Sequence, residues 1–496
     1  MGKTSSLKDK ETSAKTEAPA TGLDKVFKLK QNGTTVRTEI IAGLTTFMTM
    51  AYIIALNPNL LTGFGAEGQN LWNGVFLATC IASAIGTLCM AFLANKPFVM
   101  APGMGLNSFF AAVTANIVAM TGMTYLRSFQ SALVIIFIEG LVFIILSILN
   151  VREKIVKAIP LGVRLGIGPA IGLMLMNIGF GSNVGIYSDK GGPFYAMRDF
   201  FGSLTAKFAK DSMGEGYNMM ILTVVTMLIG LFVIIALDHK KVKGAVLYGM
   251  LVASVIYWAC EAIFFDTNPF ESLKTASFVP PFKDMAETTL FKLDFQGFAE
   301  IGWFTIITLV ITFCIIDMFD TIGTLVGTAS RAKMLDKDGN MPNMKQALLS
   351  DAVGTIAGSV TGTSTVTTFV ESASGVEAGG RTGLTAVVSA ILFLLCIFIA
   401  PLAAIIPAAA TSSALIYVGI LMLGNLKDID FSDISQLIPV AIMILAMPIS
   451  GSIGHGIGLA LISYTIIKLC TGKAKDVSVL TYILSFIFLF KFFVAL

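Results

Sequence analysis

Thr363-Ser-Thr-Val-Thr-Thr-Phe-Val370 is a β-branched run that leads into the glycine-rich segment Glu371-Ser-Ala-Ser-Gly-Val-Glu-Ala-Gly-Gly380. This stretch is too polar and too interrupted for a lipid-facing helix, although the chain around it is apolar enough to sit in lipid. Irregular backbone is tolerated at membrane depth only where it is buried in protein or lines a cavity. A carboxylate at that depth costs about 2.5–3.5 kcal/mol. We therefore expect Glu371 to line a polar site or a proton path inside a membrane protein.

Composition agrees with a membrane class. Of the 496 residues, 55% are hydrophobic and 13% are charged, whereas soluble domains carry about 25% charged residues. The net charge of +3 is too small to indicate a nucleic-acid partner. The six cysteines lack metal-site or CxxC spacing, and we expect no metal and no cofactor. Residues 1–36, rich in Lys, Thr and Ser, predict a disordered cytoplasmic tail.

Apolar windows recur along the chain, most of them near the ~20 residues that cross a bilayer as helix. They predict an all-α polytopic protein with about fourteen transmembrane segments. A further apolar run, 478–495, either spans the membrane or lies in its interface. The windows are 38–58, 71–95, 103–120, 129–149, 164–181, 218–237, 242–265, 301–327, 347–362, 371–380, 381–406, 408–425, 436–450 and 453–470.

Basic residues gather in alternate connections between these windows. Because Lys and Arg favour cytoplasmic loops, we expect a multi-pass protein of the plasma membrane with a cytoplasmic N-terminus. The residues concerned are Lys96, Arg152, Lys154, Lys157, Lys240, Lys241, Lys243, Arg331, Lys333, Lys337, Lys345, Arg381, Lys468, Lys473 and Lys475.

The third and tenth segments have the same design. Lys96-Pro-Phe-Val-Met-Ala-Pro-Gly-Met-Gly-Leu-Asn107 and Thr365-Val-Thr-Thr-Phe-Val-Glu-Ser-Ala-Ser-Gly375 both predict a short extended strand followed by a helix start. The two lie seven spans apart, an odd number, so they cross the membrane in opposite directions. Matching interrupted segments in two halves are the best sequence pointer to a transporter's binding site. We expect two inverted repeats of seven segments.

Acidic and hydroxyl side chains of the eighth segment supply further candidates. Asp317, Asp320, Thr321 and Thr324 are spaced i, i+3, i+4 and i+7, which predicts a shared helical face directed away from lipid. Structural pairing with a cation is the simpler explanation, but no Lys or Arg lies mid-span in the neighbouring core helices. We assign Asp320 and Asp317, with Glu371, to proton coupling and substrate binding, and Thr324 to substrate binding.

The extended runs complete the candidate substrate site. Asn107, one turn into its helix, can donate and accept hydrogen bonds at once. Thr368 and Phe369 belong to the second extended run, where the ring of Phe369 could stack on a flat ligand. Glu139, midway along the fourth segment, is either a second proton-relay group or a structural hydrogen-bond partner. Carboxylates and an amide suit a planar, weakly charged ligand with N–H and C=O groups, such as a nucleobase.

Four motifs resemble those of a known family. They are 37–58 (Arg-Thr-Glu-Ile-Ile-Ala-Gly-Leu-Thr-Thr-Phe-Met onward), Ala101-Pro-Gly-Met-Gly-Leu-Asn-Ser-Phe-Phe110, Asp317-Met-Phe-Asp-Thr-Ile-Gly-Thr324 and 363–375. In this order they resemble the signatures of the AzgA-like purine permeases, guanine/hypoxanthine/adenine transporters of the nucleobase–ascorbate (xanthine/uracil permease) superfamily. The resemblance covers nearly the whole chain after residue 36.

The resemblance implies a proton symporter that imports purine nucleobases by alternating access. Its substrate would be held by Asp320 (or Asp317) and Glu371, with Asn107 on the third segment. It also implies a core domain and a gate domain, and it allows a homodimer through the gate. The expected divisions are core parts 37–150 (spans 1–4) and 301–407 (spans 8–11), and gate parts 151–300 (spans 5–7) and 408–496 (spans 12–14 and the final run).

Two other classes stay open from the residues. An anion transporter or exchanger can use the same architecture, but its site would be basic or neutral rather than acidic. A membrane-embedded enzyme would need a nucleophile–base pair or metal ligands, and both histidines lie far from the acids in sequence. We therefore expect no enzymatic activity. Glycines 166, 168, 172 and 179, with 451, 454, 456 and 458, are expected to line the seam between gate and core.

Overall fold

The computed structural model describes residues 22–63, 67–149, 159–181, 184, 204, 216–274, 276–331, 334, 341–450 and 452–494. Some of the expectations above fall elsewhere in the chain. Tail residues 1–21, the seam glycine Gly451 and the basic positions Arg152, Lys154, Lys157, Lys333 and Lys337 lie outside the described residues.

The first half of the described chain is a series of helices interrupted by one strand. Its main elements are α1 (Gly22–Phe27), α2 (Val36–Met50), α3 (Ile53–Leu61), α4 (Gln69–Cys89) with the π-helical turn η1 (Met90–Ala94), β1 (Met100–Pro102), α5 (Met104–Thr121), α6 (Tyr125–Ile148), α8 (Leu161–Phe180), α11 (Gly216–His239), α12 (Ala245–Phe264), α13 (Glu271–Lys274), α14 (Phe282–Thr288) and α15 (Phe295–Glu300).

The second half repeats this design, with a strand between two helices. Its elements are α16 (Trp303–Arg331), α17 (Met344–Thr361), β2 (Val366–Thr368), α18 (Ser372–Glu377), α19 (Gly383–Leu395), η3 (Cys396–Ile399), α20 (Ala400–Ala404), α21 (Ala408–Met422), η4 (Leu423–Asp428), α22 (Ile434–Ser450), α23 (Ile453–Cys470), η5 (Ala474–Asp476) and α24 (Val479–Val494).

The expected membrane class is borne out by these helices. Within the described ranges, 10 helical stretches are long and apolar enough to cross a membrane, and three shorter apolar helices accompany them. The predicted ninth and tenth segments correspond to α17 and to the short α18. The predicted extended runs of the third and tenth segments contain β1 and β2.

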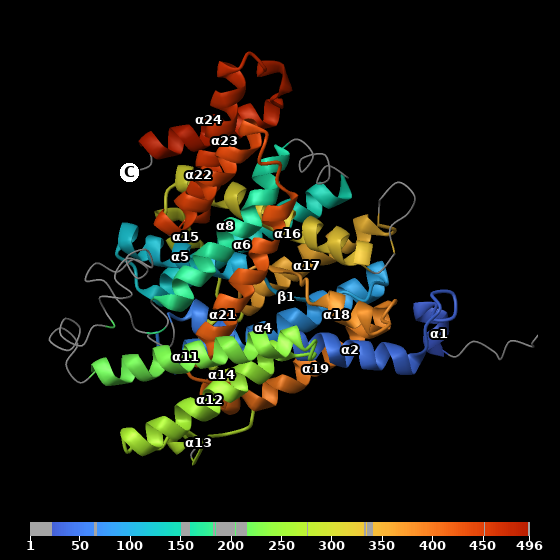
Figure 1. Ribbon diagram of the computed structural model, residues 1–496, viewed down its shortest axis with the longest axis vertical. Helices are drawn as coiled ribbons and strands as arrows, with labels where there is room; N and C mark the ends of the chain where they lie inside the picture. The colour runs from blue at the N-terminus through green and yellow to red at the C-terminus, as the bar shows by residue number, and fades with distance from the viewer. Residues whose placement is uncertain are drawn as a thin grey trace, which may run out of the picture.

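Helix packing sorts the spans into two groups. In the first group α4 packs against α3, α17 and α19, α2 packs against α18 and α19, and α6 packs against α17. In the second group α8 packs against α21 and α22, α11 against α12 and α21, and α22 against α23. Helix α16 lies between the groups, since it contacts α6, α18 and β2 as well as α8, α23 and α24, and α2 with α12 and α5 with α8 also meet across the boundary. In Figure 1, α22, α23 and α24 rise at the top of the view, and α11 and α12 lie at the bottom.

The two strands pair at the centre of the molecule, where Figure 1 labels β1. They run antiparallel, with Met100 opposite Thr368, Ala101 opposite Thr367 and Pro102 opposite Val366. The pairing continues at both ends, because Gly103 N donates to Thr365 O (3.1 Å) and Phe369 N donates to Val99 O (3.0 Å). Since each strand leads directly into a helix, α5 and α18 start from opposite ends of this small sheet.

The N-terminal expectation needs one correction. Residues 22–36 were predicted to be disordered, but they include α1, whose Phe27 is buried with Leu29 against Leu384 of α19. Two buried apolar side chains in a strongly polar segment, Phe27 and Leu29, dock it on the helical body. At the other end, the final apolar run forms α24, and Ser485 of that helix lies within hydrogen-bond distance of Thr465 on α23 (2.8 Å).

Candidate functional site

Glu371 follows β2 after two intervening residues and immediately precedes the first residue of α18. Its Oε1 accepts a hydrogen bond from the hydroxyl of Tyr52 (2.8 Å), which is 1% exposed. Tyr52 lies in the break between α2 and α3. The hydrogen-bond partner of Glu371, in the tenth segment, therefore comes from an interruption in the first segment. A second contact joins the same elements, because the hydroxyls of Thr49 and Ser374 are 3.0 Å apart.

Asp320 of α16 lies close to the start of α5, the helix that follows β1. Its Oδ2 would be 3.4 Å from a Cβ placed on Gly103, the residue that joins β1 to α5. The same Cβ would be 2.7 Å from Cγ2 of Thr367. A glycine is therefore required here by the close approach of β2. The Asp320 side chain is partly exposed, and the carboxylates of Glu371 and Asp351 are near enough to interact with it electrostatically.

A buried hydroxyl connects the acids of two helices. Thr321 Oγ1 lies 3.1 Å from Asp317 Oδ1, 2.8 Å from Asp351 Oδ1 and 2.6 Å from Thr367 Oγ1. All four residues are at most 1% exposed. Asp351, on α17, was not among the predicted site residues, nor were Tyr52 and Thr367. The predicted common face of α16 is thus divided, because Asp317 is fully enclosed while Asp320 and Thr324 are partly exposed.

Asn107 makes its hydrogen bonds to neighbouring protein groups. Its Nδ2 donates to Pro102 O (3.1 Å), and its Oδ1 accepts from the hydroxyl of Ser364. The side chain is completely buried. Both ends of the amide are therefore used in joining α5 to the segment before β2.

The two residues predicted from the second extended run lie on different faces of it. Side chains alternate along a strand, so Thr368 lies on the face opposite Thr367 and Asp320. Its Oγ1 is buried and makes no hydrogen bond within the described structure. Phe369 is 6% exposed and belongs to the main apolar core.

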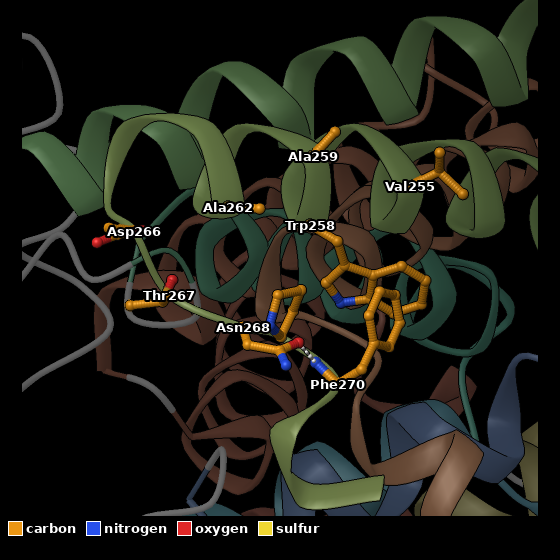
Figure 2. Close-up of a pocket in the computed structure, with 9 residues that line it drawn as sticks. Val255, Trp258, Ala259, Ala262, Asp266, Thr267, Asn268 and Phe270 are labelled. Carbon is orange, nitrogen blue, oxygen red and sulfur yellow. Dashed lines mark hydrogen bonds between the residues drawn. The ribbon is translucent and has the colours of Figure 1, made fainter. Parts of the chain in front are cut away.

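A surface cavity lies away from these acids. It measures about 610 Å³ at the end of α12 and contains none of the predicted site residues. Figure 2 shows the rings of Trp258 and Phe270 forming one wall, with centroids 5.1 Å apart, and Asn268 Oδ1 accepting from the Phe270 backbone N–H. Most of the residues that line this cavity are apolar, unlike the carboxylates around Asp320 and Glu371.

The expected gate seam is only partly correct. A Cβ on Gly166 or Gly456 would meet Met443 or Met447 of α22, so these glycines join helices of the second group to one another. Gly172 and Gly179 meet α21 in the same way, and Gly458 meets Phe488 of α24. Contact between the groups is made instead at Gly105 against Ile171 and at Gly454 against Thr312. Glycine spacing indicates close helix packing but does not identify the neighbour.

The sequence is similar to those of known permeases. Residues 37–455 match the Permease family (Xan_ur_permease). Adenine permease AdeP of Escherichia coli (strain K12) is 36% identical over 469 residues, which are 95% of this chain and 95% of that protein. Guanine/hypoxanthine permease PbuO of Bacillus subtilis (strain 168) is 35% identical over 471 residues, 95% of this chain and 100% of that protein.

The fold also matches solved structures. The transmembrane domain of the cyanobacterial bicarbonate transporter BicA superposes with a TM-score of 0.60 at 15% identity, covering 86% of this chain and 97% of that domain. This likeness confirms the predicted fold of two inverted repeats with a core and a gate. As its four motifs predicted, the chain is a multi-pass membrane protein that belongs to the Permease family, with adenine and guanine/hypoxanthine permeases among its relatives.

Proposed function

We propose that the protein imports purine nucleobases by proton symport through alternating access. One observation carries the proposal: two acids of the second repeat each meet the first repeat at an interrupted segment. Asp320 lies beside Gly103, between β1 and α5, and Glu371, between β2 and α18, accepts a hydrogen bond from Tyr52, between α2 and α3. The relatives named adenine permease and guanine/hypoxanthine permease support a purine as the ligand. A pair of carboxylates favours a ligand rich in N–H groups over an inorganic anion.

The roles follow from the contacts. Glu371, oriented by Tyr52, would accept hydrogen bonds from adjacent N–H groups of the purine, and Asp320 would accept at the start of α5. Thr324, Asn107, Thr368 and Phe369 remain candidates from the sequence. The hydrogen bonds of Asn107 and the core packing of Phe369 favour a supporting role over direct binding for these two residues.

The proton would be carried by the acids themselves. The single hydroxyl hydrogen of Thr321 faces both Asp317 and Asp351, and it can be donated to only one of them. Asp317 and Asp351 are both buried and both lie beside the hydroxyl of Thr321. Because two negative charges repel each other in such a site, one of the two carboxylates is expected to bind a proton. Asp317 is therefore a candidate for proton coupling with Asp320 and Glu371, and Asp351 joins it.

The moving parts would be the two groups of helices. Residues 37–150 and 301–407 would form the core, and residues 151–300 and 408–496 the gate, with rocking of one against the other around the acids. The protein would lie in the plasma membrane with its N-terminus in the cytoplasm, and a homodimer would form through the gate.

Reconstituted protein tests the proposal. With the vesicle interior alkaline, labelled adenine, guanine, hypoxanthine or xanthine should accumulate. Glu371→Gln should abolish concentrative uptake, and Asp320→Asn should also weaken purine binding, because one acceptor becomes a donor. Glu377→Gln is the matched control, since Glu377 is an exposed carboxylate on the same helix. Uptake that follows sodium instead of protons refutes symport, and bicarbonate uptake without a purine response favours the anion-transporter alternative.

A further inference from the structure

Three consecutive hydroxyl residues precede β2, and each contacts a polar side chain from a different helix of the first repeat. All six residues are completely buried. The pairs are Thr363 with Asn57 of α3, Ser364 with Asn107 of α5, and Thr365 with Glu139 of α6.

The geometry of the outer pairs is well defined. Asn57 Nδ2 donates to Thr363 Oγ1 (2.9 Å) and also to Thr79 Oγ1 of α4 (2.7 Å). Thr365 Oγ1 donates to Glu139 Oε2 (2.8 Å). A buried hydrogen bond to a charged acceptor is among the stronger ones in proteins. Three helices therefore hold a segment that would otherwise be a short connection between α17 and β2.

The same segment is also held through its backbone. Thr365 O accepts from Gly103 N (3.1 Å), which ties it to the start of α5. On the other side, Thr363 N donates to Gly358 O (2.8 Å), and a Cβ on Gly358 would lie 2.5 Å from Ser364 O. No side chain larger than hydrogen fits at Gly358 unless the segment moves.

We propose that Asn57, Asn107 and Glu139 form a clasp on residues 363–365 that sets the position of β2, and through it the relative positions of Thr367, Asp320 and Glu371. The inference rests on the proposed purine function and deepens it. The three clasp residues act as positioning residues, because their buried side chains contact residues 363–365. Glu139 thereby acts as a hydrogen-bond acceptor and not as a proton relay.

Hydroxyl deletions in residues 363–365 test the clasp. Thr365→Val keeps the side-chain shape and removes the donor to Glu139, and Thr363→Val and Ser364→Ala remove the other two contacts. Purine affinity, measured by calorimetry on folded protein, should fall roughly tenfold for Thr365→Val, since a buried charge-assisted hydrogen bond is lost. Thr361→Val is the matched control, because that hydroxyl bonds only to carbonyls of its own helix.

Substitutions at Glu139 separate positioning from proton transfer. Glu139→Leu should weaken purine binding at least as much as Thr365→Val, and the double variant should be little worse than Glu139→Leu alone, because both substitutions remove the Thr365–Glu139 hydrogen bond. Glu139→Gln retains an acceptor oxygen and should keep nearly normal affinity and proton-driven uptake. Loss of proton-driven uptake in Glu139→Gln overturns the positioning role.

Affinity and thermal stability together decide the outcome. Variants that melt earlier but bind purine with wild-type affinity would show that the clasp only stabilises the fold, and the proposal fails. If Glu139→Leu does not fold, the isosteric Thr365→Val carries the same comparison. A wild-type protein that binds no purine refutes the proposed function and the clasp with it, whereas normal wild-type binding with unaffected variants refutes the clasp alone.

Discussion

The hydrogen bond from Tyr52 to Glu371 offers the cleanest single-atom perturbation of the acidic cluster. Tyr52→Phe removes one oxygen from a side chain that is 1% exposed and leaves its packing intact. The lost bond is 2.8 Å long and ends on a carboxylate, so its removal costs about 1.5–3 kcal/mol. If this bond orients Glu371 toward the ligand, purine affinity should fall by roughly 10- to 150-fold.

Calorimetric titration of purified Tyr52→Phe with adenine and with guanine measures this effect. Tyr125→Phe makes the same chemical change on α6, where the hydroxyl donates to Leu61 O (2.7 Å) and contacts no site residue; it should bind purine normally. The Tyr52→Phe/Glu371→Gln double variant should bind about as weakly as Glu371→Gln alone. Wild-type affinity in Tyr52→Phe, with binding lost in Glu371→Gln, would refute the orienting role of Tyr52.

Two further substitutions probe the elements that hold the site. Gly103→Ala should strongly reduce purine uptake while the protein still inserts and purifies, because the new Cβ would lie 2.7 Å from Cγ2 of Thr367 and force β1 and β2 apart; unaltered uptake kinetics would contradict this. Glu39→Ala should destabilise the protein by about 2–3 kcal/mol, since the carboxylate accepts from the backbone N–H groups of Arg381, Thr382 and Thr385 at the start of α19. Thermal melting in detergent measures this loss of stability. The melting temperature of Glu39→Gln should lie between those of the wild type and Glu39→Ala.

The membrane class, the paired interrupted segments and two of the acids could be predicted because each carries a large energetic signal. A carboxylate in an apolar span, such as Asp320 or Glu371, is too costly to be incidental. Proline and glycine mark the broken backbone of 96–107 and 363–380 in the same way. These signals show where such residues lie along the chain. For a fold built of repeated spans, those positions are enough to predict the architecture.

Tyr52 and Asp351 are absent from the predicted site, for different reasons. Tyr52 is an aromatic residue in an apolar helix, and nothing in its neighbours distinguishes it from a core tyrosine. Asp351 is a carboxylate within the apolar window 347–362 and carries the same signal as Asp320, but the window alone does not show that it faces Thr321 of α16. Thr367 and Thr368 lie on opposite faces of the strand, and the sequence does not show which of the two hydroxyls faces Thr321 of α16. Asn107 was located correctly, but its hydrogen-bond partners come from a segment far away in sequence.

The pairing of β1 with β2 has a consequence for biogenesis. Met100 and Thr368 lie more than half the chain apart, so the first strand enters the membrane long before its partner has been synthesised. Until then, the Val99 carbonyl and the Gly103 N–H lack the partners Phe369 and Thr365 that they have in the folded protein, in a medium where each unsatisfied group costs several kcal/mol. The nascent N-terminal half must shelter them in the translocation machinery, in water or against its own helices. An N-terminal half expressed alone is therefore expected to be a substrate for membrane quality control.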